Sequence, residues 1–479
     1  MLTQLRLQNF KTWQDTTSLR LAPITVFFGG NSSGKSSIGQ FLLMLKRTVE
    51  QPDRNMVFHT ADDQSMMHLG SYSSYVFDGE TERDVAFDLD WNCEKVRVLI
   101  DPLHTRRYRW SQMKFSGKVG QLTDSERVVS KEFSYVLPAR RVRMPLKDGT
   151  SRIATVPEVR VGLERANGAD KYRLMTSEYK AKHSPGRAWP LPSPARFYGF
   201  PEELYSYFQN VAGFADLQLE LERVLKSIYY LGPLRQYPKP SYTWAGQAPS
   251  DVGFQGEATV AALLAGAERS FNVGGKTRYA PLQQIVARWL VKLGVAENFE
   301  VECASKSTHT YRTLLKMPGQ KKPITLSSVG FGVSQVLPVV TQAFYAPHHS
   351  TIIIEQPELH LHPAVQSGLA DLFIEAIRTK ENGKERNVQF VIESHSEHFL
   401  RRLQRRIAEQ QLKPEDVAVY FCESPQDAGG SGIRPLEVDK FGRIKNWPKN
   451  FFGDAMTDVA EMRKAGLKRE MAEAKGAKA

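Results

Sequence analysis

The sequence has little cysteine and no long apolar run. Its three cysteines, Cys93, Cys303 and Cys422, lie far apart among 479 residues and form no Cys-x-x-Cys pair. This spacing argues against a disulfide framework and against a zinc site. No stretch approaches the roughly 18 consecutive apolar residues that a membrane-spanning helix needs, and residues 1–10 alternate polar and apolar side chains instead of forming a signal-peptide core. We therefore expect a cytoplasmic protein with no membrane partner.

Acidic residues are fewer than basic residues, and most of this difference lies in one segment of the chain. The chain has 64 Lys and Arg against 52 Asp and Glu, a net charge of +12, and residues 101–196 alone hold 20 basic and 9 acidic side chains. A field concentrated in this way attracts a nucleic acid or an acidic protein surface. It is equally typical of a solvated, loop-rich face that keeps a protein soluble, so both readings stay open.

Hydrophobic periodicity, proline positions and the motifs below divide the chain into five parts. Residues 1–100 show two strand patterns, a glycine loop and a helical pattern, whereas residues 101–196 contain eight prolines and are predicted to be a basic, loop-rich insertion with short strands. Residues 197–300 predict a helical subdomain with a return strand. Residues 301–453 alternate strands and helices as a parallel α/β sheet does. Residues 454–479 predict a helical or frayed tail.

A phosphate-binding motif lies between a predicted strand at 24–28 and a predicted helix. The stretch GGNSSGKS satisfies GxxxxGK[ST]. In this pattern glycines let backbone N–H groups surround phosphates, the lysine reaches the β and γ phosphates, and the serine hydroxyl ligates Mg²⁺. We therefore predict that ATP and Mg²⁺ bind at the following residues: Gly29, Asn31, Ser32, Ser33, Gly34, Lys35, Ser36 and Ser37.

A second buried strand, predicted at 351–354, leads into an acid. Glu355 is placed where a carboxylate on the Mg²⁺ side of the site is expected, so Ser36 and Glu355 are the predicted metal ligands. Gln356 occupies the next position, where related chemistry uses a carboxylate base. An amide positions water but takes no proton, which predicts slow hydrolysis. Glu358 is a substitute acid if the turn returns it toward the γ phosphate.

A histidine follows a third predicted strand, at 388–392. His395 is expected at the carboxyl edge of the sheet, where ligands of open α/β sheets gather. An imidazole there can sense the γ phosphate. The alternative is an ordinary histidine at a strand end.

Together these motifs resemble those of ABC-type ATPase heads, and most closely the OLD-like AAA family ATPases of bacteria, which include ATPase subunits of phage-defence systems such as Septu and PARIS. The resemblance rests on the order of four motifs, and on an ending at 438–453 similar to that of one branch of the group. The four are the phosphate loop, the stretch LSSVGFGVSQ at 326–335, the block EQPELHLHP at 355–363 and the Ser394-His395-Ser396 triplet.

The resemblance implies an α/β, ABC-type P-loop ATPase head with a mixed sheet, an inserted basic segment and a helical subdomain. It implies that Glu355 is the Walker B acid, Gln356 lies at the catalytic-base position and His395 at the switch position. Ser328, Gly330, Gly332, Ser334 and Gln335 match the signature motif loosely. In such proteins the signature of one subunit closes over ATP bound to another, so the expected partner is a second copy, in an ATP-dependent head-to-tail dimer or higher oligomer.

Three functional readings follow. The first is an anti-phage defence ATPase that senses infection and controls a separate effector, such as a nuclease or toxin. The second is a DNA-repair or recombination ATPase that binds duplex DNA through residues 101–196. The third is a degenerate ATPase that holds nucleotide structurally.

Overall fold

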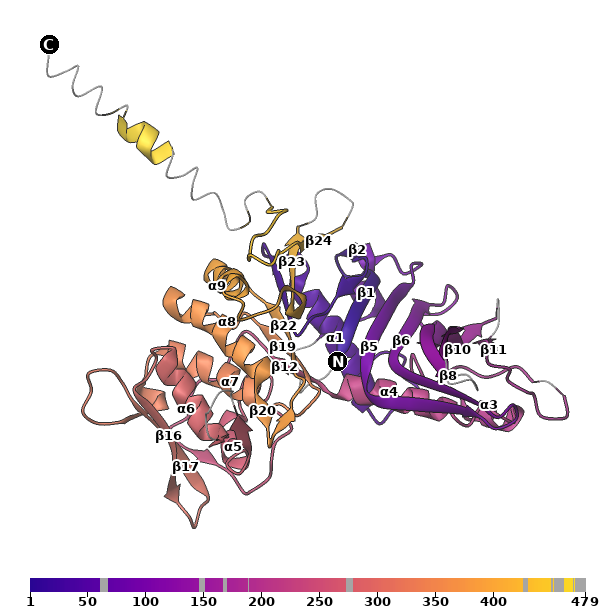
Figure 1. The fold of residues 1–479 in the computed structure, drawn as a ribbon, viewed down its shortest axis with the longest axis horizontal. Coiled ribbons are helices and arrows are strands. Elements are labelled where there is room, and N and C mark those ends of the chain that lie inside the picture. The colour runs from indigo at the N-terminus through magenta and orange to yellow at the C-terminus, as the bar shows by residue number, and fades with distance from the viewer. Residues whose placement is uncertain are drawn as a thin grey trace.

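The computed structural model describes residues 1–60, 68–145, 151–166, 170–187, 189–272, 279–424, 430–448, 451, 461–467 and 469. Two large sheets and the helices around them form its body (Figure 1). No helix in these ranges is both long enough and apolar enough to cross a membrane.

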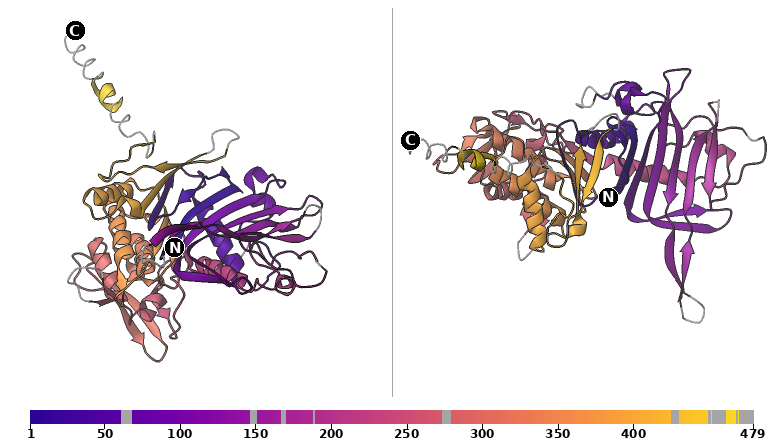
Figure 2. Two further views of the ribbon diagram at one scale, coloured as in Figure 1. Left: turned by 45° about the vertical axis from the view of Figure 1, so that its right-hand side comes forward. Right: turned by 90° about the horizontal axis from the view of Figure 1, so that it is seen from above.

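The first sheet is antiparallel and comes from the N-terminal half of the chain. Its strands follow the order β11-β10-β7-β6-β5-β1-β2, and β3 pairs with β1. Their bounds are Leu2–Phe10 (β1), Trp13–Asp15 (β2), Leu19–Arg20 (β3), Val85–Asp101 (β5), Arg106–Gln121 (β6), Val128–Leu137 (β7), Val159–Arg165 (β10) and Tyr172–Ser177 (β11). The long purple strands in Figure 2 show this sheet from above.

The basic segment is built differently from the expectation. Strands β6, β7, β10 and β11 continue the same sheet as β1 and β5, and Arg140–Pro145 (β8) pairs with Ser151–Val156 (β9). Strands β8 to β11 are short, with six or seven residues each, but β6 has 16 and β7 has 10. The segment therefore holds more strand than a loop-rich insertion would, because its prolines fall between strands or at a strand end, where they remove no ladder hydrogen bond. The boundaries at 101 and 196 stay predictions.

The second sheet is mixed, as predicted. Its order is β12-β19-β22-β4-β23-β24, and all neighbours are parallel except β23 and β24. The bounds are Ile228–Leu231 (β12), Thr351–Glu355 (β19), Gln389–Glu393 (β22), Ile24–Gly29 (β4), Val417–Glu423 (β23) and Gly432–Leu436 (β24). Segments some 390 positions apart thus become neighbours, and β22 lies between β4 and β19.

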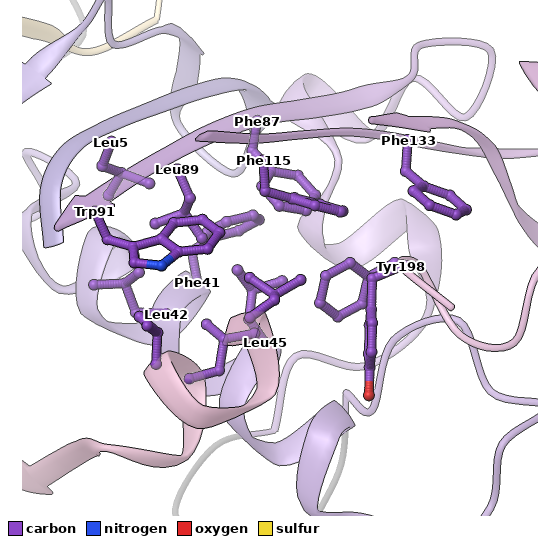
Figure 3. Close-up of a cluster of buried hydrophobic side chains, with 14 of the residues drawn as sticks. Leu5, Phe41, Leu42, Leu45, Phe87, Leu89, Trp91, Phe115, Phe133 and Tyr198 are labelled. Atoms are coloured by element: carbon purple, nitrogen blue, oxygen red, sulfur yellow. The ribbon is translucent and has the colours of Figure 1, made fainter. Parts of the chain in front are cut away.

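Helix α1 (Lys35–Glu50) is held between the two sheets. Figure 3 shows Phe41, Leu42 and Leu45 of this helix beneath the large sheet, among side chains such as Phe87 and Trp91 of β5. The same core includes Ile353 of β19 and Val391 of β22 on the second sheet. Both faces of α1 are therefore fixed by packing. This packing also fixes the first turn of the helix, which directly follows the phosphate loop.

Helices from the C-terminal half cover the other face of the mixed sheet. Ile352, Ile354 and Ile392 point into this second core, because side chains on a strand alternate between faces. The helices of this part of the molecule are Thr259–Ala265 (α5), Leu282–Lys292 (α6), Phe331–Tyr345 (α7), Pro363–Arg378 (α8) and Glu397–Ala408 (α9). The layers are thus antiparallel sheet, α1, mixed sheet and helices.

The remaining elements include α4, which packs against α1, and several short helices and strands. They are Tyr72–Tyr75 (α2), Phe77–Gly79 (η1), Glu202–Tyr207 (α3), Phe214–Lys226 (α4), Tyr242–Thr243 (β13), Ser270–Asn272 (β14), Ala280–Pro281 (β15), Asn298–Ser305 (β16), Thr310–Lys316 (β17), Ile324–Thr325 (β18), Leu326–Ser328 (η2), Lys380–Glu381 (β20), Lys384–Glu385 (β21) and Pro414–Asp416 (η3). The predicted frayed tail falls mostly outside the described residues.

Candidate nucleotide-binding site

The phosphate loop connects β4 to α1. Gly34 has a φ of 87°, a left-handed conformation that favours glycine. A Cβ at this position would also lie 2.5 Å from the Thr12 hydroxyl and 2.8 Å from the Trp13 ring, while the Trp13 indole N–H donates to the Gly34 carbonyl at 3.1 Å. The glycine is therefore required both by backbone conformation and by close packing against the turn between β1 and β2.

Two side chains at the start of α1 meet a carboxylate from a distant strand. Lys35 is buried and donates to the carbonyls of Gly29 at 3.2 Å and Gly30 at 2.6 Å. The Ser36 hydroxyl donates to Glu393 at 2.7 Å, and the Lys35 ammonium lies 3.8 Å from the same carboxylate. Glu393 ends β22, and burial raises its pKa, against the effects of Ser36 and Lys35.

A cavity of about 400 Å³ opens over this loop. Residues 31–37 line it, and so do Lys11, Thr12, Gln40, Gln356, Glu393 and His395. The predicted loop residues, the predicted base-position amide and the predicted switch histidine are thus brought together in one place.

Glu355 lies at the same sheet edge, one strand further from the loop. It is the register partner of Glu393 across β19 and β22, is largely buried, and hydrogen-bonds to the Tyr230 hydroxyl. Burial and then the Glu393 carboxylate raise the pKa of Glu355 to about 7, as expected when two acids share a site of low polarity.

The backbone after Glu355 is held by a buried arginine. Arg235 donates to the carbonyl of Glu355 at 3.0 Å and to that of Gln356 at 3.3 Å. Gln356 has a φ of 44°, and its N–H donates to the Glu393 carbonyl at 2.9 Å. Such strained backbone in a non-glycine residue costs of order 1–3 kcal/mol and persists only where surrounding contacts fix it. Burial lowers the pKa of Arg235 to about 10.

Glu358 does not line the cavity in the described structure. Its buried carboxylate accepts the backbone N–H of His395 at 2.6 Å, and burial raises its pKa. It therefore joins the loop after β19 to the loop after β22. His395 itself is exposed and lines the cavity. The pKa of its imidazole is lowered, first by partial desolvation against the surrounding protein and then by the positive charge of Lys35.

The signature residues lie elsewhere. Gly330 caps α7 and is exposed, as is Ser328, whereas Ser334 lies buried inside the helix. Helix α7 begins at Phe331, so Gly332 and Ser334 both belong to its first turn or just beyond it. A Cβ at Gly332 would lie 3.1 Å from the His360 carbonyl. Among the described residues that line the phosphate-loop cavity, none belongs to the signature.

The donor set fits Mg²⁺ and a triphosphate. A serine hydroxyl and two carboxylates are the hard oxygen ligands that Mg²⁺ prefers, usually one or two of them beside phosphate oxygens and water. The N-terminus of the 16-residue helix α1 adds backbone N–H groups and a favourable dipole for phosphate. Within the described residues no group of three or more His, Cys, Asp or Glu gathers as a protein-only metal site.

Sequence reasoning missed six residues of this site. Four of them line the cavity, namely Lys11, Thr12, Gln40 and Glu393, and the Lys11 ammonium donates to Gln40 at 2.5 Å. The other two, Tyr230 and Arg235, contact Glu355. Glu393 alone had a local signal: it precedes Ser394 and His395 at the end of an apolar strand.

Comparison with protein families agrees with this geometry. Residues 280–400 match a family model described as AAA ATPase domain, AAA_15. This part of the chain is therefore similar to an AAA ATPase domain. Residues 412–462 match a second model, described as a protein of unknown function, DUF3696. The ATPase match leaves out the phosphate loop, which the fold adds by placing β4 between β22 and β23. A comparison with curated proteins finds no match.

Solved structures give distant similarities. The SMC head domain from Thermotoga maritima is 11% identical, with 91% of this chain and 99% of that chain covered, at a TM-score of 0.38. The Smc head domain with an extended coiled coil bound to the C-terminal domain of ScpA, derived from Pyrococcus furiosus, is 12% identical, with 96% and 99% covered, at 0.41. Similarities this distant carry no information on function.

Proposed function

We propose that the chain binds Mg-ATP at the phosphate loop, hydrolyses it slowly, and uses this cycle as a switch. The observation that carries the proposal is the single cavity lined by Lys35, Ser36, Gln356, Glu393 and His395. These residues come from three segments that are far apart in sequence, and each has a chemical type suited to a triphosphate and its metal ion.

Each residue has a distinct part in this account. Lys35 and the loop N–H groups bind phosphate oxygens, while Ser36 serves the metal side together with the buried carboxylates that end β19 and β22. Mg²⁺, when bound, neutralises charge on the phosphates. Gln356 orients water without taking its proton, and His395 stands at the cavity mouth where it can respond to the γ phosphate.

We propose further that ATP joins two copies head to tail. The N-terminus of α7 at Gly330 is exposed and has no side-chain cap within the described part of the chain. The first N–H groups of a helix have no carbonyl partner one turn earlier in the helix, so a helix end of this kind favours an anion. It belongs to a helix of 15 residues, and it packs against the loop that follows Glu355 through Gly332. A second copy is the partner that would bring this helix end to the nucleotide.

The role we propose for the switch is that of sensor or scaffold in bacterial anti-phage defence, controlling a separate effector. Support comes from the similarity of the motif set to ATPase subunits of such systems. Phage challenge of cells that carry the gene with its neighbours tests this role. Protection that Lys35→Ala removes supports it, and unchanged phage titres contradict it.

A DNA-repair or recombination ATPase is the second candidate, and one observation favours it. Many basic side chains of the large sheet pair with acids, as Lys118 and Lys131 do with Asp84. In contrast, Arg106, Arg107 and Arg109 at the start of β6 are exposed and have no acidic partner within the described part of the chain. Such a cluster can contact phosphates of a duplex.

Binding of a fluorescent ATP analogue by the Lys35→Ala variant tests the nucleotide site. We expect affinity to fall below detection, because a buried triphosphate loses its main cation. Lys46→Ala on the same helix is the matched control, since Lys46 pairs with Glu50 at the far end of α1. Retained affinity in Lys35→Ala would refute the site.

A further inference from the structure

We propose that Glu393 is a direct Mg²⁺ ligand of this chain, beside Ser36, a role that the motif pattern gives to Glu355. The inference rests on the proposed ATP site and names a further residue in it. The Glu393 carboxylate already lies at 2.7 Å from the hydroxyl that ligates the metal in phosphate-loop proteins.

The strand order explains why Glu393 is the nearer acid. β22 separates β4 from β19, so the strand that ends in Glu393 is the immediate neighbour of the strand that leads into the phosphate loop. Glu393 lines the cavity over the loop, and Glu355 is not among the residues described as lining it. Glu355 instead faces the Tyr230 hydroxyl and the Gly39 region of α1.

A purely structural ion pair with Lys35 accounts poorly for this geometry. The ammonium already donates to the carbonyls of Gly29 and Gly30, and its distance of 3.8 Å from Glu393 exceeds that of a charge-assisted hydrogen bond. Among the residues that the structure describes, no cation lies closer than Lys35 to this buried carboxylate, and such a carboxylate is costly. A divalent ion bound between Ser36 and the phosphates compensates it directly.

This arrangement has a measurable consequence for nucleotide binding. Without a divalent cation, the Glu393 carboxylate repels the phosphate oxygens that enter the cavity. With Mg²⁺ the same carboxylate becomes attractive. Glu393 therefore makes nucleotide affinity depend strongly on the metal, independently of any hydrolysis.

The test measures binding of a fluorescent, non-hydrolysable ATP analogue to the full chain, in Mg²⁺ and in EDTA. We expect wild type to bind at least about tenfold more tightly with Mg²⁺. Glu393→Gln keeps the size of the side chain and can still accept from Ser36. It should bind more tightly than wild type in EDTA, and its gain from Mg²⁺ should fall to about threefold or less.

The control is Glu423→Gln, because Glu423 ends β23 on the other side of β4, is half-buried and pairs with Arg434. The Glu423→Gln variant should show the same increase in affinity with Mg²⁺ as wild type. A full Mg²⁺ gain in Glu393→Gln would overturn the inference while leaving the ATP site intact. Absence of binding by wild type in both buffers would instead refute the proposed function, and this inference with it.

Thermal unfolding establishes that each variant is folded. Should Glu393→Gln not fold, Glu393→Asp decides the question, since it keeps the charge but withdraws it by one methylene. We expect an intermediate Mg²⁺ gain from this variant. A gain equal to that of wild type would contradict direct ligation.

Discussion

The carboxylate of Glu358 accepts a hydrogen bond of 2.6 Å from the backbone N–H of His395. This contact connects the loop after the acid strand β19 to the loop that carries the predicted switch histidine. Glu358 thus holds His395 in place, and its carboxylate is directed to that backbone N–H.

Replacing Glu358 by Ala should reduce ATP turnover about tenfold through loss of this positioning. Nucleotide affinity should change by less than about threefold, because the phosphate loop is untouched. Steady-state turnover and analogue binding measured together separate the two effects. Equal losses in binding and turnover would contradict a positioning role, and Glu397→Ala at the exposed start of α9 is the control.

Replacing Gln356 by Glu should raise the hydrolysis rate by about tenfold or more, because a carboxylate can accept the proton of the attacking water. Gln411→Glu, on the surface after α9, controls for the added charge. An unchanged or lower rate in Gln356→Glu would mean that the base lies elsewhere.

Replacing Arg235 by Met should destabilise the protein by about 2–4 kcal/mol, since the carbonyls of Glu355 and Gln356 lose a buried donor. Turnover should fall as well, because the strained conformation of Gln356 loses a contact that fixes it. Urea unfolding and turnover assays check both effects. Arg434→Met, at an exposed ion pair, should stay within about 1 kcal/mol of wild type.

The raised pKa of Glu355 predicts that the stability of nucleotide-free protein in EDTA depends on pH. Its pKa is raised from 4.5 to about 7, burial being the main cause. Between these values the native state binds more protons than the unfolded state, so the contribution of Glu355 to stability falls as pH rises through this window.

The Glu355→Gln variant removes this titration. The free energy of unfolding of the variant minus that of wild type should be larger at pH 8 than at pH 5, by about 1–3 kcal/mol. Urea unfolding at the two pH values measures the difference. Equal effects of the substitution at the two pH values would contradict the raised pKa and would mean that Glu355 is ionised in the native state throughout this range.

The basic cluster at the start of β6 separates the two candidate roles. If the chain is a DNA-binding ATPase, replacing Arg106, Arg107 and Arg109 by Gln should weaken duplex binding and reduce the slope of log affinity against log salt by about 3. Fluorescence anisotropy at several salt concentrations measures this slope. Duplex binding that is absent in wild type, or insensitive to salt, would remove the DNA candidate.

Local patterns in the sequence predict the core of the fold well. The apolar runs before Gly29 and Glu355 are buried strands, and strands and helices alternate over much of residues 301–453. These elements are marked by local residue patterns. Pro363, for example, is the first residue of α8, where the missing N–H of proline removes no hydrogen bond of the helix.

Local sequence patterns could not predict the contacts between segments that are far apart in the chain. Glu393 meets Ser36 across 357 positions, and Arg235 meets Glu355 across 120. Only the order of strands in the mixed sheet brings these pairs together. The prolines of residues 101–196 likewise give no indication that the strands between them extend the sheet of β1 and β5.

The central claim is that this chain is a working ATP switch, and ATP turnover by the purified protein, with its mass in solution measured with and without ATP, tests it most directly. We predict slow turnover that Lys35→Ala abolishes, and a mass that rises to at least that of a dimer only with ATP. Turnover no higher than that of Lys35→Ala, with a mass indifferent to ATP, would contradict the account.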